Sequence, residues 1–164
     1  MKLLVSLTGS APDNIIRERP VSEWTLDDIS EKLRDIDFAM LLTHTESGEI
    51  AGRPMSNNRD VEYDGDSYFF TCEKTRIVAD IGRNPKVALS YRGREGLLGK
   101  PPIFITLQGE AELIRDKDAF KAHWTEDLER WFEDGVETAG LVLIKVHASR
   151  IHYWDGENDG EFAV

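Results

Sequence analysis

Apolar and polar residues alternate with a period of two in several segments of this chain, as they do in half-buried β-strands. The pattern is clearest from Ile103 to Ile114 and from Gly140 to Trp154. Gly109 interrupts the first segment, and a glycine inside a strand is typical of a bulge or bend. Shorter predicted strands occupy residues 38–43, which form an apolar run, and residues 50–55, 67–71 and 86–91. The alternation predicts a small antiparallel barrel.

Glycine and proline place the connections. Asp64-Gly65 lies between Val61–Tyr63 and Ser67–Thr71 and predicts a β-hairpin, since both turn residues tolerate positive φ. Thr25 begins a predicted helix as its N-cap, and Asp28 completes a capping box.

Two more helices are predicted between the strands. The first runs from Thr75 to about Gly82 and is stopped by Asn84-Pro85. The second runs from about Asp116 to Asp134 and carries an apolar stripe that we expect to pack on the core: Phe120, Trp124, Leu128 and Trp131.

The predicted fold is therefore mainly β, of the α+β type, with a six-stranded antiparallel barrel and peripheral helices. Residues 1–23 show little periodicity and are interpreted as an N-terminal arm. Residues 24–156 form the barrel domain, and residues 157–164 are predicted to be an acidic C-terminal tail.

Net charge limits the partners. The chain has 164 residues and a formal charge of −11, so it repels nucleic-acid backbones and anionic lipid. No apolar run approaches the roughly 18 residues of a membrane span, and polar residues interrupt the short apolar start after Lys2. Cys72 is the only cysteine and excludes an intrachain disulfide. We expect a soluble cytoplasmic protein that binds neither nucleic acid nor membranes.

One segment departs from this acidic average. Residues 73–100 carry seven basic and three acidic residues, a net charge of +4. Within it, Thr75-Arg76 opens a helix directly after a strand that ends at Thr71. Free backbone N–H groups, hydroxyls and a guanidinium at a helix start make a phosphate site. A solvated barrel rim explains the charge equally well, so both interpretations stay open at this point.

The sequence holds no set of residues for chemistry without a cofactor. The four histidines, His44, His123, His147 and His152, lack metal-ligand spacing, and the last two are expected on opposite strand faces. Cys72 has no evident histidine partner, and no phosphate-binding glycine loop occurs. If the protein is an enzyme, a cofactor carries its reaction.

A set of short strings, in order, resembles the FMN-binding split barrels of the pyridoxamine 5′-phosphate oxidase superfamily, and most closely their bacterial general stress protein branch. The resemblance covers about Thr25 to Gly156. The strings are Arg53-Pro-Met-Ser56, Tyr68-Phe-Phe-Thr71 with Thr75-Arg76, Asn84-Pro85, Gln108-Gly-Glu-Ala111, Trp131-Phe132 and Tyr153-Trp154-Asp155.

The resemblance implies a homodimer with FMN in clefts between the subunits. Residue by residue, it places Arg53, Pro54, Met55 and Ser56 along the flavin from one strand, and Phe70 and Thr71 from the next. Thr75 and Arg76 would hold the phosphate. Trp154 would reach the flavin across the dimer interface.

This chain departs from the family pattern twice. Ile77 stands where the family usually has a phosphate-binding Lys. After Trp154-Asp-Gly156 the chain is acidic and lacks the Arg-x-His string that holds a pyridoxal substrate, which excludes a true pyridoxamine phosphate oxidase. We expect a flavin-dependent oxidoreductase acting on an unidentified small molecule. The alternatives are a non-catalytic module that stores or senses flavin, and a barrel that has exchanged flavin for haem, a deazaflavin or a scaffold role.

Overall fold

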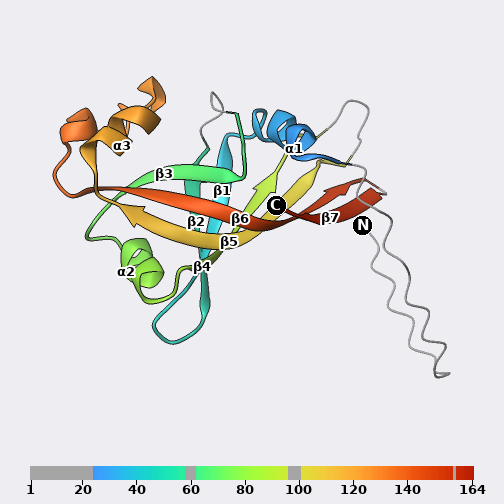
Figure 1. Ribbon diagram of the computed structural model, residues 1–164, viewed down its shortest axis with the longest axis horizontal. Coiled ribbons are helices and arrows are strands. Elements are labelled where there is room, and N and C mark those ends of the chain that lie inside the picture. Colours follow the sequence, from blue (N-terminus) through green and yellow to red (C-terminus); the bar gives the residue numbers. More distant parts are fainter. Residues whose placement is uncertain (1–23, 58–61, 96–100, 157) are drawn as a thin grey trace.

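The computed structural model describes residues 24–57, 62–95, 101–156 and 158–164. These residues form a seven-stranded antiparallel sheet with the order β2-β1-β4-β5-β6-β3, in which β7 pairs with β6 (Figure 1). The strands are β1 Phe38–His44, β2 Ile50–Ser56, β3 Asp66–Cys72, β4 Lys86–Arg92, β5 Phe104–Ile114, β6 Leu141–Asp155 and β7 Asn158–Ala163. The helices are α1 Leu26–Leu33, α2 Arg76–Arg83 and α3 Lys117–His123. The sheet is open and resembles a split barrel, so the predicted fold class is confirmed.

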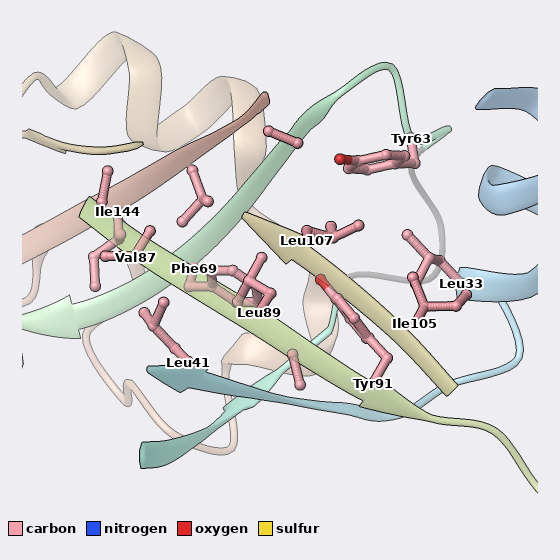
Figure 2. Close-up of a cluster of buried hydrophobic side chains, with 14 of the residues drawn as sticks. Leu33, Leu41, Tyr63, Phe69, Val87, Leu89, Tyr91, Ile105, Leu107 and Ile144 are labelled. Carbon is pink, nitrogen blue, oxygen red and sulfur yellow. The ribbon is translucent and has the colours of Figure 1, made fainter. Parts of the chain in front are cut away.

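The inner face of the curved sheet encloses the main core. Alternate residues of β1, β4, β5 and β6 point into it, as the period of two requires. Ile29 and Leu33 of α1 are buried in this core, and so are Ile77 and Ile81 of α2. Figure 2 shows how tightly the central side chains of this core gather between the strands.

Strand β6 is paired with other strands along both of its edges. It pairs along its length with β5, while its other edge pairs first with β3 and then with β7. In Figure 1 it crosses the whole molecule, from the side of α2 and α3 to the side of β7. The first half of β6 therefore lies beside β3, and the second half lies beside β7.

Strand β6 contains a β-bulge opposite Gly109 of β5, the position at which the sequence predicted a bulge or bend. Gly109 pairs with Ala148 and Gln108 pairs with Arg150, which leaves Ser149 as the additional residue. A Cβ atom at Gly109 would lie 1.9 Å from the carbonyl oxygen of His147, so only glycine allows this approach.

The bulge overturns one prediction about the histidines. Alternation alone places His147 and His152 on opposite faces of the strand. The extra residue restores the parity, because Ala148 and Ile151 both enter the main core while His147 and His152 both lie on the outer face.

The expected helix start at Thr25 is confirmed, with both hydrogen bonds of the capping box to Asp28. The predicted hairpin is wrong. Gly65 has a positive φ of 109°, but β3 pairs with β6, and Glu62 and Tyr63 are not in a strand. The backbone N–H of Tyr63 instead donates to the Ser30 hydroxyl of α1. Val61 and the predicted arm, residues 1–23, lie outside the described residues.

The predicted acidic tail is also corrected, and it accounts for the seventh strand. Residues 158–163 form β7 because their apolar positions alternate, with Phe162 packed against the main core. Asp159 and Glu161 are the alternate positions, paired with Trp154 and His152 on the outer face.

The long helix predicted from Asp116 to Asp134 ends early. Only α3 is α-helical, and short 3₁₀ turns follow at Glu126–Leu128 and Gly135–Glu137. The backbone of Trp124 is extended, which brings its ring to 5.1 Å from that of Phe70. Trp131, expected in the core, is 60% exposed.

None of the helices in the described ranges is long and apolar enough to span a membrane.

Candidate functional site

The start of α2 retains the features of an anion site. Thr75 occupies the N-cap position, but its side chain makes no cap hydrogen bond. Its hydroxyl donates to the carbonyl oxygen of Cys72 at 2.8 Å and lies 3.4 Å from the Thr71 hydroxyl. The first N–H groups of a helix lack partners within the helix, and the exposed Arg76 side chain lies beside them. Two hydroxyls and these amides thus lie at the helix start, and the first helical residue adds an exposed guanidinium.

Ile77, which stands where the resembled family usually has a phosphate-binding lysine, packs in the core. Its side chain is 3% exposed and belongs to the main core. The isoleucine fills this part of the core, and the anion site has one cation fewer than the family pattern predicts.

Arg53 is already engaged by protein groups. Its Nη2 lies 2.6 Å from Oδ2 of Asp80 in α2, and its Nη1 donates to the Thr43 hydroxyl at 2.6 Å. Thr43 in turn donates to the same Asp80 oxygen at 3.1 Å. Asp80 is 5% exposed, so this network is a half-buried tie between the edge strand β2, β1 and α2.

The other predicted residues of β2 and β3 fall into different environments. Pro54 is exposed, Met55 packs against the main core, and Ser56 lines a narrow cavity together with Phe70. Phe70 meets the rings of Phe120, Trp124 and Phe132 edge-on at 5.1–6.5 Å. Its side chain is therefore committed to an aromatic cluster, whereas its neighbour Thr71 lies on the opposite face of β3.

Trp154 lies at the far end of β6 from the anion site. Cys72, three residues before Thr75, pairs with Leu141, and from Leu141 to Trp154 the strand spans about 40 Å. Trp154 is 38% exposed and packs against His152, with ring centres 3.8 Å apart and the two planes tilted by 35°. One FMN molecule is too short to contact both Thr75 and Trp154 of the same chain.

Large exposed apolar side chains gather around Trp154 on the outer face of the sheet. We call this the apolar patch, and it consists of Phe38, Met40, Phe104 and Trp154, which are 53%, 41%, 42% and 38% exposed. Phe104 and Trp154 are directly paired across β5 and β6. A patch of this kind marks an interaction surface.

An open groove of about 750 Å³ occupies the same outer face. Its floor includes the small residues Ala88, Gly109 and Ser149, and its charged and imidazole side chains come from four strands. These are His44, Lys86, Glu110, Glu112, Lys145 and His147. The sequence analysis missed this set, because its members are neighbours only through the register of β1, β4, β5 and β6.

Asp66 joins the groove to β3. Its carboxylate oxygens accept from Lys145 at 2.8 Å and lie 2.7 Å from Nδ1 of His147. Burial raises the pKa of Asp66, but the hydrogen bonds from Lys145 and His147 outweigh it and hold the pKa below its ordinary value. The hydrogen bond between Lys145 and Asp66 raises the pKa of Lys145.

The sequence of this chain is similar to that of a known protein family. The family model for pyridoxamine 5′-phosphate oxidase-like proteins matches residues 25–164. General stress protein 26 of Bacillus subtilis (strain 168) is 28% identical over 131 residues, which cover 76% of this chain and 86% of that protein.

Solved structures show the same fold. A protein of Clostridium acetobutylicum related to general stress protein 26 superposes with a TM-score of 0.70 at 20% identity, covering 85% of this chain and 94% of that one. General stress protein 26 of Bacillus anthracis str. Sterne gives 0.67 at 23% identity, covering 85% and 98%. By its sequence match and its fold, the chain belongs to the pyridoxamine 5′-phosphate oxidase-like family.

Proposed function

We propose that this protein is an FMN-binding homodimer that passes electrons between flavin and a small molecule. The observation that carries the proposal is the uncapped start of α2, where the hydroxyls of Thr71 and Thr75 lie together and Arg76 is the first residue of the helix. Family membership supports it, since the same residues match the family's flavin motifs.

The phosphate of FMN fits the start of α2. The N–H groups of the first turn and the Thr75 hydroxyl donate to its oxygens, and Arg76 supplies a charge-assisted contact. Arg53 acts indirectly, because its pair with Asp80 fixes α2 against β1 and β2. Lys74, which is exposed in the preceding turn, is the nearest further cation in the sequence.

The flavin ring needs a second subunit. Because Trp154 and Thr75 of one chain are about 40 Å apart along β6, a site that contains both side chains takes them from two copies.

The outer face is suited to this pairing. The apolar patch and the groove lie at different places on one face, so a two-fold axis through that face brings the patch of each copy onto the groove of the other. Self-complementarity of this kind is what an isologous dimer requires. The pairing would bury the patch and convert the open groove into an enclosed cleft.

The chemistry in that cleft is two-electron transfer, which bound FMN supplies. The chain's own residues bind the phosphate, orient the ring and exclude water through the apolar patch. The exposed acid of β7 that pairs with Trp154, Asp159, disfavours a phosphorylated substrate.

The first test is an FMN titration of flavin-free protein, followed by quenching of flavin fluorescence. We expect saturable binding at micromolar concentration or tighter, and Arg76→Ala to weaken it about tenfold or more, as the loss of a charge-assisted contact predicts. Arg83→Ala is the matched control, since Arg83 lies at the other end of α2. Equal affinity of the two variants would contradict the phosphate site.

Mixed dimers test the shared cleft. Arg76→Ala and Trp154→Ala each damage both sites of a homodimer, but a mixed dimer has one site with both defects and one with neither. Recovery of tight FMN binding after subunit exchange is the expected result. Failure to recover it, with exchange verified by mass, would mean that one chain supplies both side chains to each site and would refute the shared cleft.

A flavin-binding module without turnover is the second candidate. Its support is β7, which occupies the sequence position of the family's substrate-binding string and offers acids at its outward positions. Rapid multiple turnover of bound flavin with a nicotinamide nucleotide and an electron acceptor would eliminate this candidate.

A further inference from the structure

The groove contains a histidine whose geometry suits proton transfer. His147 is 68% exposed at its side chain and lines the groove, while its Nδ1 lies 2.7 Å from Oδ1 of Asp66. Lys145 holds the other oxygen of the same carboxylate at 2.8 Å. Lys145 and His147 therefore hold Asp66 through its two carboxylate oxygens.

This contact determines where the imidazole carries its proton. The pKa of Asp66 lies below its ordinary value, so at neutral pH the group is a carboxylate, which only accepts hydrogen bonds. Nδ1 of His147 must then be the donor. Nε2 is left to accept a proton when the ring is neutral, or to donate one when the ring is protonated. An oriented pair of this kind prepares a histidine for acid and base catalysis.

The position of the pair connects it with the proposed cleft. Glu110 of β5 pairs with His147, and Lys86 of β4 pairs with Glu110, so a row of polar side chains crosses the groove. The neighbouring Gly109 and Ser149 leave space in the floor. If the apolar patch of a second copy covers the groove, this row lines the flavin cleft.

We propose that His147, oriented by Asp66, is the proton donor and acceptor for a carbonyl or quinone substrate in this cleft, an inference that rests on the proposed function. In the reductive direction, a quinone takes a hydride from reduced FMN at one oxygen and a proton from Nε2 of His147 at the other. Quinol and oxidised FMN result, and the neutral imidazole regains its proton from solvent. The reverse sequence oxidises an alcohol or quinol.

The orientation is tested without turnover. Long-range ¹H–¹⁵N correlation spectra of labelled protein report which ring nitrogen of each histidine carries the proton. We expect the neutral form of His147 to carry it on Nδ1, and Asp66→Ala to transfer it to Nε2. A wild-type His147 protonated on Nε2 would overturn the proposal.

The chemical role is tested with menadione, a naphthoquinone, as the acceptor. FMN-loaded protein is reduced with dithionite without oxygen, and its reoxidation is followed from pH 5 to 9 in rapid mixing. We expect His147→Gln to slow reoxidation at least tenfold at neutral pH and to remove the pH dependence, with FMN affinity unchanged within about twofold. His123→Gln, an outer-face histidine that does not line the groove, is expected to keep the wild-type profile.

The outcomes separate the two proposals. If FMN does not bind, the proposed function fails and the proton role fails with it. If FMN binds normally and His147→Gln reoxidises with the wild-type rate and pH profile, only the role of His147 is refuted.

Discussion

The main core and the aromatic cluster beneath α3 are both apolar, yet the protein builds them differently. The main core lies on the inner face of the sheet and is closed by α1 and α2. The aromatic cluster lies on the outer face of β3 and β6, where side chains of these strands and of α3 pack with others from the segment that follows α3, namely Trp124, Phe132 and Val136. The first is lined by neighbouring strands that are paired along their length, whereas the second depends on a few ring contacts. Removing one side chain should therefore have global effects in the first and local effects in the second.

The largest effect is expected for Leu107→Ala. Leu107 is 1% exposed at the centre of the main core, and a cavity there costs about 4 kcal/mol of unfolding free energy. Chemical denaturation monitored by circular dichroism should show a single transition at lower denaturant. A loss below about 1 kcal/mol would show that the barrel interior repacks as freely as a surface cluster.

Phe120→Ala should cost less, about 3 kcal/mol, although Phe120 is only 4% exposed. The reason is that α3 can detach while the strands stay paired. Hydrogen exchange should become faster within residues 117–137 and stay unchanged in β4 and β5. Equal acceleration throughout the sheet would mean that the two cores unfold as one unit.

Acidification should weaken the cluster more gently than the Phe120 variant. Burial, followed by the charge of Lys145, lowers the pKa of His123, whose ring stacks on Tyr68 with centres 3.7 Å apart. The docked ring prefers to be neutral, so stability is full above the ordinary histidine pKa and falls as the pH drops from about 6.5 through the lowered value. Near-UV circular dichroism between about pH 7.5 and 5.5 measures this change.

The control for this pH effect is His123→Phe, which keeps a stacked ring but does not titrate. Its near-UV signal should stay constant over the same range. A signal that falls equally in the variant would assign the pH effect to another group.

Trp131→Ala should have the smallest effect, within about 0.5 kcal/mol, because the side chain is 60% exposed. Thermal unfolding of wild type and variant compares them directly. A larger loss would show that Trp131 packs on something absent from the isolated chain, such as the second subunit proposed above.

Sequence patterns predicted the two regions with different success. The alternation of apolar and polar residues predicts the strands of the barrel, and the capping box predicts the start of α1. Both are local patterns, so both elements could be predicted from the sequence. The spacing of Phe120, Trp124, Leu128 and Trp131 also fits a helix, but the contact of Trp124 with Phe70 is long-range and overrides it. The acidic composition of residues 157–164 concealed the alternation that makes β7.

The candidate site shows the same division. Thr71, Thr75 and Arg76 are close in sequence, and local reasoning brought them together as the structure does. Arg53 was expected to face the flavin, but Asp80, which engages it, lies one helix away and no local pattern pairs them. The role of His147 was missed because its partner, Asp66, lies 81 residues earlier in the sequence.

The bulge at Ser149 makes β6 sensitive to its length in a way that its composition does not reveal. Inserting one more residue between Ala148 and Ile151, with no second bulge to absorb it, would reverse the parity of the strand beyond it, turning Ile151 and Tyr153 to solvent and Trp154 toward the interior. Substitutions at Ser149 are tolerable, since its side chain is exposed, and its deletion would remove the bulge while keeping Ile151 and Tyr153 on the core face. Among relatives of this chain, we therefore expect those with one residue fewer between Ala148 and Trp154 to have a regular strand there with the same residues facing the core.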